Sequence, residues 1–173
     1  VIHKTDVGGI ILDLNSSEEV VKAFNEIVSN VKSRVPDAYI KGIVVRKMAP
    51  KGFEALIGVH RDPFFGPIVA LGSGGILVEL IRDVSFRVAP LSVEDAWEML
   101  SETKAYVMMK GYRDQPELDV ESVVDTLLRV SRLAMDIPEI TSIDINPLFV
   151  YEKGEGCMAI DVKIILKEQH QTN

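Results

Sequence analysis

The chain has 173 residues, of which 47% are apolar and 26% charged, so it is long enough to bury one or two compact cores. Its net charge of −7 argues against a nucleic-acid partner held mainly by phosphate contacts, which require clustered lysine and arginine. The one cysteine, Cys157, excludes an internal disulfide, and no apolar run approaches the roughly 20 residues that cross a bilayer. We therefore expect a cytoplasmic protein with neither a membrane nor a nucleic acid as partner.

The first 34 residues predict a strand followed by a helix. The opening VIHKTDVGGIILDL enters a strand-like run without a cap or turn, so we expect that an N-terminal part of a larger fold is missing. Within it, Ile10–Leu14 is apolar enough for a strand. From Ser16 onward the apolar residues recur at helical spacing, and Ser16 with Glu19 has the pattern of a capping box.

The middle of the chain predicts a series of strands. Ile43–Met48 and Phe53–His60 are β-rich and separated by the turn APKG, which favours a hairpin, and Pro67–Leu71 continues as a third strand. The glycine-rich run Gly72–Gly75 then precedes a further strand at Ile76–Ile81. That run either wraps a phosphate with backbone N–H groups or is a plain tight turn. It matches neither the P-loop pattern nor the dinucleotide-binding fingerprint, so the sequence does not decide between the two.

The last third of the chain predicts two helices and a hairpin. The helices extend from Ser92 to about Lys104 and from Asp119 to about Met135, and SIDINPLFVY pairs with CMAIDVKIIL through a KGEG turn. We expect an α+β fold, mostly antiparallel sheets with packed helices. The phenylalanines, including Phe64, Phe65 and Phe86, are expected to pack in its interior.

The predicted C-terminal hairpin carries a candidate metal site. Alternation sends Asp144 and Asn146 to one face of the first strand, and Asp161 and Lys163 share a face of the second. If the register brings these faces together, Asn146 and Asp161 form a pair of hard oxygen donors of the kind that Mg²⁺ prefers. A solvated face of an ordinary two-stranded ribbon gives the same alternation, so the pattern alone leaves both interpretations open.

The histidine near the start of the chain is a candidate nucleophile. His3 and Lys4 precede the pair Gly8–Gly9. A neutral imidazole attacks phosphorus, while a lysine and glycine-rich backbone stabilise charge on phosphoryl oxygens. An incidental polar residue near a chain end is the alternative, and His60 and His170 are expected to be incidental.

Several segments occur together in an order typical of one family. HKTDVGGI, GIVVRKM, the long block from RDPFFGP to RVAPL, GYRDQP and DINPL resemble the ATP-grasp domain of NDP-forming acyl-CoA synthetases. The similarity is to the β subunit of ADP-forming acetyl-CoA synthetase and, more loosely, to that of succinyl-CoA synthetase. It implies a partial ATP-grasp nucleotide-binding domain over residues 1–167 and a polar tail at 168–173. Asp114 departs from the family, which has glycine there.

The resemblance also implies a chemistry and a set of site residues. The cofactors would be ATP/ADP and Mg²⁺, and an α subunit or domain would carry the CoA site and a phosphohistidine, making a hetero-oligomer. The implied reaction is a phosphoryl relay from the phosphohistidine of the α subunit to ADP, and His3 is the second histidine that passes the phosphoryl group on. Asp144 faces the incoming phosphohistidine loop, and Asn146 with Asp161 binds the metal. The implied nucleotide or phosphate contacts are Lys4, Gly8, Gly9, Val45, Arg46, Lys47, Met48 and Glu54.

Two other functions fit a similar sequence. One is a synthetase-like module that senses nucleotide without turnover, and the other is a ligase that acts through an acyl phosphate without a phosphohistidine. A sensor could dispense with His3 or Asp144, and the second type of ligase would not need His3. Both residues are present in this chain, which favours the relay enzyme.

Overall fold

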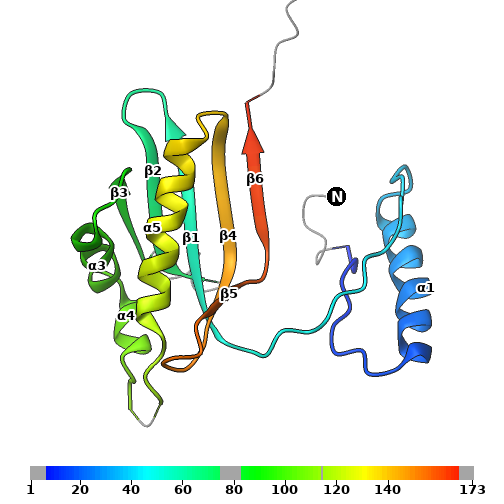
Figure 1. The fold of residues 1–173 in the computed structure, drawn as a ribbon. Coiled ribbons are helices and arrows are strands. Elements are labelled where there is room, and N and C mark those ends of the chain that lie inside the picture. The colour runs from blue at the N-terminus through cyan, green and yellow to red at the C-terminus, as the bar shows by residue number, and fades with distance from the viewer. Residues whose placement is uncertain (1–6, 75–82, 114, 168–173) are drawn as a thin grey trace, which may run out of the picture. The chain divides into compact units, whose positions relative to one another are not determined.

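The computed structural model describes residues 7–74, 83–113 and 115–167 (Figure 1). The chain divides into two compact units, residues 1–50 and 51–173. In the first unit, the one helix among the described residues is α1, Ser17–Arg34.

The start of α1 is confirmed as predicted. The Ser16 side chain accepts a hydrogen bond from the Glu19 backbone N–H at 3.1 Å, and the Glu19 carboxylate accepts one from the backbone N–H of Asn15 at 2.7 Å. These bonds satisfy backbone donors that a helix N-terminus leaves free. The return bond of the capping box therefore ends one residue earlier than the pattern predicts.

The strands predicted in the first unit are wrong. Ile10–Leu14 and Ile43–Met48 are both irregular, and Leu12, Val44 and Val45 are exposed. A strand needs a neighbour to pair its backbone groups, and the described part of this unit offers none. The predicted hairpin between residues 43 and 60 consequently does not form.

The second unit is built on a six-stranded antiparallel sheet. Its strands are β1 Phe53–Asp62, β2 Gly66–Ser73, β3 Val84–Val88, β4 Ile140–Val150, β5 Cys157–Ala159 and β6 Val162–Leu166. The order is β3-β2-β1-β4, and β4 then pairs with β5 along one part of its length and with β6 along another. The antiparallel α+β class and the C-terminal hairpin are confirmed, whereas β3 was not predicted.

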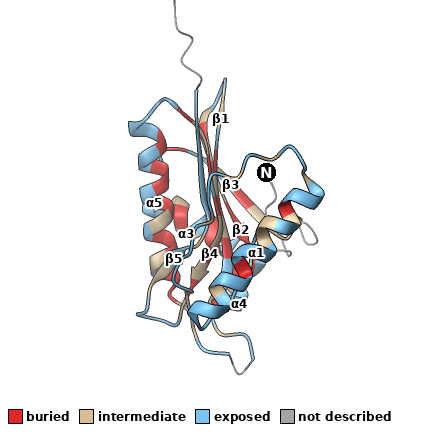
Figure 2. Ribbon diagram, turned by 90° about the vertical axis from the view of Figure 1, so that its right-hand side faces the viewer, coloured by how far each residue is buried: buried red, intermediate tan, exposed pale blue. Residues whose placement is uncertain are grey.

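Among the described residues, three helices cover one face of this sheet: α3 Val93–Ser101, α4 Lys104–Met109 and α5 Val120–Asp136 (Figure 1). Alternate strand residues such as Ile57 and Leu71 are fully buried with Leu127 of α5 in the core between the layers. The burial of residues on the facing surfaces of helix and sheet is visible in Figure 2. Within the described part of the chain, no helix is both long and apolar enough to span a membrane.

The helix predicted from Ser92 to about Lys104 is confirmed as α3, and a second helix, α4, which was not predicted, follows it. α3 begins at the predicted cap, since Ser92 and Asp95 bond reciprocally, but it ends at Ser101. Thr103 is extended, and its hydroxyl accepts a hydrogen bond from the Tyr106 backbone N–H at 3.2 Å, so it caps α4. A threonine in this position starts a new helix instead of continuing the old one.

The other face of the sheet is exposed, and this overturns the expected packing of three phenylalanines. Phe86 is 58% exposed because it lies on the face turned away from the helices. Phe64 and Phe65 are 90% and 69% exposed in the turn between β1 and β2. That turn is ordered by Asp62, whose carboxylate accepts hydrogen bonds from both backbone N–H groups, so it needs no burial of the rings.

Arg61 joins the end of β1 to the end of α5, and its loss should destabilise this unit. Its guanidinium donates to the carbonyl oxygens of Ala134 at 2.5 Å, Ile140 at 2.7 Å and Ile137 at 3.3 Å. These carbonyls include ones that a helix C-terminus leaves without an intrahelical partner. We expect Arg61→Met to lower the free energy of unfolding by about 2–3 kcal/mol, measured by urea denaturation.

Arg129, an exposed arginine of α5, provides the control for the Arg61 substitution. Arg129 forms an ion pair with Asp125 one turn away, and both side chains are largely exposed. Such pairs contribute about 0.3–0.5 kcal/mol, so Arg129→Met should have little effect. Equal losses for the two variants would contradict the structural role of Arg61.

Candidate active site

The exposed face of the sheet carries the predicted acidic and amide residues on β4. Ile143 and Ile145 are buried toward the helices, whereas Asp144 is exposed and Asn146 is half-buried on the opposite side. This is the alternation that the sequence predicted. Asp144 and Asn146 therefore share the open face.

The register of the hairpin places Asp161 next to Asn146. The Asn146 backbone N–H donates to the Asp161 carbonyl oxygen at 3.1 Å, and the Ile160 N–H donates to the Pro147 carbonyl oxygen at 3.0 Å. One step along the ladder, Asp144 lies opposite Lys163. Of the registers that the pattern left open, the structure has the one that brings Asp144, Asn146 and Asp161 together.

Both neighbours of β4 depart from regular pairing at Asn146. The register with β1 shifts by one residue between Ala55 and Ile57, opposite Asn146 and Pro147. On the other side, the chain bends at Asp161, between the end of β5 and the start of β6. Bulges of this kind redirect side chains and are common beside active sites. The backbone at Asn146 and Asp161 thus departs from the regular ladder of the sheet.

The chemistry of this pair fits magnesium bound together with phosphates. An amide oxygen and an exposed carboxylate are hard donors, and Mg²⁺ in nucleotide sites is usually held by one or two such ligands plus waters and substrate phosphates. Among the described residues there is no group of three or more His, Cys, Asp or Glu side chains that could hold an ion. Asn146 and Asp161 therefore suit a metal that arrives with its nucleotide.

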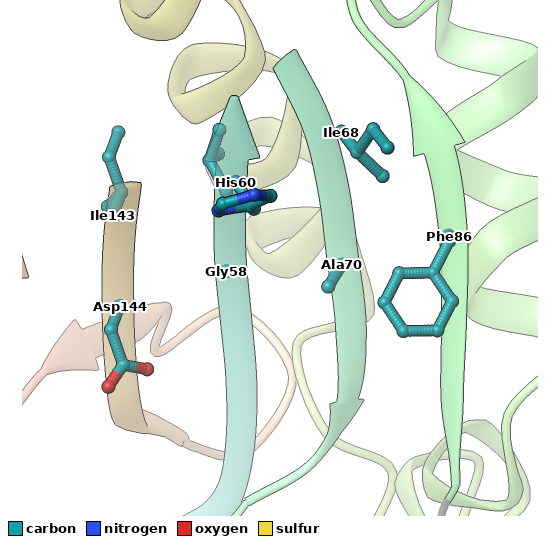
Figure 3. Close-up of a pocket in the computed structure, with 8 residues that line it drawn as sticks. Gly58, His60, Ile68, Ala70, Phe86, Ile143 and Asp144 are labelled. Carbon is teal, nitrogen blue, oxygen red and sulfur yellow. The ribbon is translucent and has the colours of Figure 1, made fainter. Parts of the chain in front are cut away.

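Next to this pair the open face is hollowed, with a cavity volume of about 550 Å³ (Figure 3). Its floor is Gly58 and Ala70, which pair across β1 and β2, and Asp144 lies opposite Gly58 on β4. Figure 3 shows the His60 ring above Gly58 and Phe86 on the far side of Ala70. The small residues Gly58 and Ala70 thus form a shallow depression between larger side chains.

Charged groups surround this hollow without filling it. Lys163 lies beyond Asp144 on β6, and Asp62 follows His60 along β1. Hydrogen bonds from the backbone N–H groups of Phe65 and then Phe64 lower the pKa of the Asp62 carboxyl, so this group is an anion at neutral pH. The hollow itself is lined mainly by apolar atoms and has its polar groups at the rim.

Glu54 and the glycines of the predicted glycine-rich run lie where β1 begins and β2 ends. Glu54 is exposed on the open face of β1, and its carbonyl oxygen accepts the Gly74 N–H at 2.8 Å. A Cβ at Gly74 would lie 2.6 Å from the Ala55 carbonyl oxygen, and one at Gly72 would lie 2.2 Å from that of Asp83. Both glycines are therefore required by close backbone approach, without any phosphate. Gly75 and the strand predicted at residues 76–81 lie outside the described residues.

The remaining predicted contacts belong to the first unit. Gly8 has φ +65°, and a Cβ there would lie 2.8 Å from the Asn30 side chain, which contacts the Gly8 carbonyl oxygen at 3.4 Å. This glycine thus fits a turn against α1, and Gly9 follows it. Val45–Met48 is irregular and exposed. His3 and Lys4 lie outside the described residues.

Sequence reasoning missed the residues that form the hollow. Gly58, Ala70 and Phe86 were not selected, and His60 was expected to be incidental. One signal was available, because a glycine in the interior of a strand often marks a site where something approaches closely. Alternation also places Gly58 and His60 on one face of β1, as the structure confirms.

The sequence matches the ATP-grasp domain family over residues 1–166. It is 44% identical over 166 residues to the β subunit of acetate–CoA ligase [ADP-forming] I of Pyrococcus furiosus, a match that covers 96% of this chain and 71% of that protein. The chain belongs to the ATP-grasp family of ADP-forming acyl-CoA synthetases. Another relative, acetate–CoA ligase [ADP-forming] I of Archaeoglobus fulgidus, is also 44% identical, but this synthetase chain covers only 24% of it.

Solved structures confirm the predicted fold of the synthetase chain. The acetyl-coenzyme A synthetase 1 of Ca. Korarchaeum cryptofilum, in complex with coenzyme A, Ca-AMPCP and HgCl+, matches with a TM-score of 0.90 and 50% identity over 96% of this chain and 72% of that one. The same enzyme with coenzyme A and Mg-AMPPCP, its phosphohistidine segment pointing towards the nucleotide binding site, matches with a TM-score of 0.82 and 45% identity over 95% and 71%. The synthetase chain therefore has the ATP-grasp fold.

Proposed function

We propose that this chain is the nucleotide-binding part of an ADP-forming acyl-CoA synthetase of the acetate–CoA ligase type. It transfers a phosphoryl group between a phosphohistidine and ADP/ATP, and CoA binds to an α partner that carries the phosphohistidine. The observation that carries this proposal is the Asn146–Asp161 pair beside Asp144 on the open sheet face. Relatives of the same fold contain Mg-AMPPCP and coenzyme A, which supports it further.

The proposed organisation extends to the whole chain. Residues 1–167 act as one nucleotide-binding domain with 168–173 as a polar tail, in a cytoplasmic hetero-oligomer without nucleic-acid or membrane partners. Adenine binds along Val45–Met48, and Glu54 contacts the ribose or phosphates. Lys4, Gly8 and Gly9 contact the phosphoryl group that His3 relays, with Arg46 and Lys47 supplying positive charge near the nucleotide.

The proposed site divides the work of phosphoryl transfer between its residues. Asn146 and Asp161 hold Mg²⁺, which when bound neutralises charge on the nucleotide phosphates. Asp144 accepts the N–H of the incoming imidazole and so fixes the tautomer, which leaves the other ring nitrogen to hold or release phosphorus. Transfer then depends on positioning and electrostatics more than on covalent chemistry by the protein.

The relay is tested with the full-length subunit and its α partner. With Mg-ATP, the wild type should form an acid-labile, base-stable phosphoprotein. His3→Ala should lower the rate of phosphoryl exchange between ATP and ADP at least tenfold, because the second imidazole is lost, while the affinity for Mg-nucleotide stays unchanged.

Each other outcome selects a different function. Exchange by His3→Ala at the wild-type rate rules out the relay role of that residue. Nucleotide binding without any phosphoprotein supports a sensor, or a ligase that acts through an acyl phosphate alone. Full turnover by this chain in isolation would contradict the two-component enzyme.

A further inference from the structure

The turn between β1 and β2, Asp62–Gly66, displays two adjacent phenylalanine rings and is here called the phenylalanine turn. Phe64 is the most exposed of the large apolar side chains among the described residues, and Phe65 beside it is 69% exposed. A single exposed apolar residue is ordinary on a protein surface, whereas neighbouring ones form a patch of the kind that marks an interaction site. The turn therefore suits contact with another surface.

The phenylalanine turn holds its rings in place without help from a partner. The Asp62 carboxylate accepts the backbone N–H groups of Phe64 at 2.8 Å and of Phe65 at 2.9 Å. Gly66 ends the turn with φ +77° and pairs with Asp62 across the hairpin. Because this backbone is ordered in advance, a contact through the rings loses little conformational entropy.

The apolar surface continues from the turn onto the β3 side of the open face. The end of β3 lies beside the turn, since the Ala89 N–H donates to the Pro67 carbonyl oxygen at 2.8 Å. Val88 and Phe86 follow on the open face of β3, and each is about half exposed. At about 200 Å² for a full aromatic side chain, the exposed parts of the three phenylalanines amount to roughly 400 Å². One side of a standard protein interface buries about 800 Å², so this surface is large enough to form half of one.

The polar groups of the open face lie on its other side. Asp144 and Asn146 are on β4, and Lys163 is on β6 opposite Asp144. The strands β1 and β2 lie between β4 and β3 in the sheet. The open face is thus divided into a half with the proposed chemistry and a half that is apolar.

The phenylalanine turn also lies at the end of the open face away from the proposed metal site. From Asn146, the pairs of β4 with β1 run through Asp144 opposite Gly58 and then Ser142 opposite His60. Beyond His60, β1 continues in the same direction to the turn, which begins about 13 Å past the row of Asp144. A partner that reaches Asp144 with the nucleotide on the Asn146 side therefore extends toward the turn.

We propose that the phenylalanine turn, together with Phe86 and Val88, is a docking surface for the α partner. This inference rests on the proposed function. The rings of Phe64 and Phe65 pack into an apolar recess of the partner and position it while its phosphohistidine segment reaches Asp144. A second copy of this chain does not suit the surface, because it would cover the end of the face from which that segment arrives.

The test removes the rings and leaves the residues proposed to bind metal and nucleotide unchanged. In the full-length subunit, Phe64→Ser combined with Phe65→Ser should raise the Kd for the immobilised α partner at least tenfold by biolayer interferometry, since buried aromatic residues dominate interface energies. Transfer of label from the partner's radiolabelled phosphohistidine to Mg-ADP should slow at limiting partner. At saturating partner it should return to within twofold of the wild-type rate. Affinity for Mg-AMPPCP by calorimetry should also stay within twofold.

Tyr112 provides the matched control, because it is an exposed aromatic residue at the other end of α5. It is 46% exposed in the connection that leads to the start of α5. Arg61, next to the turn, bonds the C-terminal end of that helix, and 17 helical residues span about 25 Å (Figure 1). Tyr112→Ser should leave the Kd for the partner unchanged. Thermal unfolding verifies the fold of each variant, and if the double variant does not fold, Phe64→Ser alone decides the test.

The outcomes separate failure of this inference from failure of the proposed function. A wild-type subunit that fails to bind the α partner or Mg-AMPPCP contradicts the proposed function itself. If the wild type binds both and the double variant keeps the wild-type Kd for the partner, the docking surface is wrong. Weaker binding of Mg-AMPPCP by the double variant would assign the turn to the subunit's own nucleotide site. A subunit that sediments alone as a dimer, and as a monomer after the substitutions, would assign it to a second copy, and either result overturns the inference.

Discussion

Replacing Asp161 by alanine should weaken binding of the magnesium nucleotide at least 100-fold, which corresponds to about 2.7 kcal/mol. The proposed metal site has only two protein ligands, Asn146 and Asp161, and Asp161 is the one that carries charge. Removing the carboxylate leaves a single neutral oxygen, which binds Mg²⁺ poorly. Calorimetry with Mg-AMPPCP on the full-length subunit measures the loss.

Three controls make this result specific to the metal. Asp161→Asn keeps an oxygen donor without the charge, so its affinity should lie between those of the wild type and Asp161→Ala. Glu155→Ala removes an exposed carboxylate from the nearby turn between β4 and β5 and should change nothing. With EDTA present, all of these proteins should bind nucleotide equally weakly. Wild-type affinity of Asp161→Ala in excess Mg²⁺ would reject the metal assignment.

Along the strands of the second unit, residues that are buried in the core alternate with residues on the open face that are available to a ligand. On β1, Ile57 and Val59 are buried against the helices, whereas Gly58 and His60 face the open side. Because the two sets alternate, residues on the open face can be chosen for a ligand without altering the core. Gly58 illustrates this freedom, since its Cβ would contact nothing closer than 3.7 Å.

The elements that were predicted from the sequence are those encoded locally. α1 and α5 have helical periodicity, and each begins directly after a residue whose side chain caps it, Ser16 and Asp119. The C-terminal hairpin has a short turn, which limits its register. The alternation predicted Asn146 and Asp161 as neighbours only if the register brought their faces together, and the bulge at Pro147 could not be predicted, because it depends on pairing with β1.

The errors arose where structure depends on distant partners. Ile43–Met48 has the composition of a strand but no described strand beside it, whereas Val84–Val88 was overlooked and is a strand because it pairs with β2. Strand propensity is weak evidence without knowledge of the neighbour. The hollow was missed for the same reason, since Gly58, Ala70 and Phe86 meet only when the register of three strands is known.

Replacing Asp119 by alanine should be strongly destabilising. Asp119 is only 9% exposed, and one carboxylate oxygen accepts the Ser122 N–H at 3.0 Å as the cap of α5. The other oxygen accepts the N–H groups of Gly154 and Gly156, each at 2.9 Å, in the turn between β4 and β5. One side chain thus joins the helix to the hairpin that carries the proposed metal ligands.

The expected loss follows from the number of donors left without an acceptor. Loss of the helix cap costs about 1 kcal/mol, and two further N–H groups left unsatisfied bring the total to about 3–4 kcal/mol. Asp119→Asn should lose only part of this, because its one amide oxygen can still accept from either the helix cap or the turn while its NH2 group faces the other donors. Urea denaturation at pH 7 measures both variants. Asp125→Ala, which removes an exposed carboxylate from the same helix, should lie within about 0.5 kcal/mol of the wild type.

The pH dependence identifies the carboxylate as the cause. Burial raises the pKa of Asp119, but the N–H groups of Gly156, Ser122 and Gly154 outweigh it, so the pKa in the folded protein is below the unfolded value of about 3.9. A lowered pKa contributes stability that is present above the unfolded pKa and is lost as the pH falls through the folded one. The difference between wild type and Asp119→Ala should therefore be full at pH 7 and shrink below about pH 4. A difference that stays constant to pH 3 would show that the alanine acts by lost packing, since protonation removes only the charge-assisted bonds.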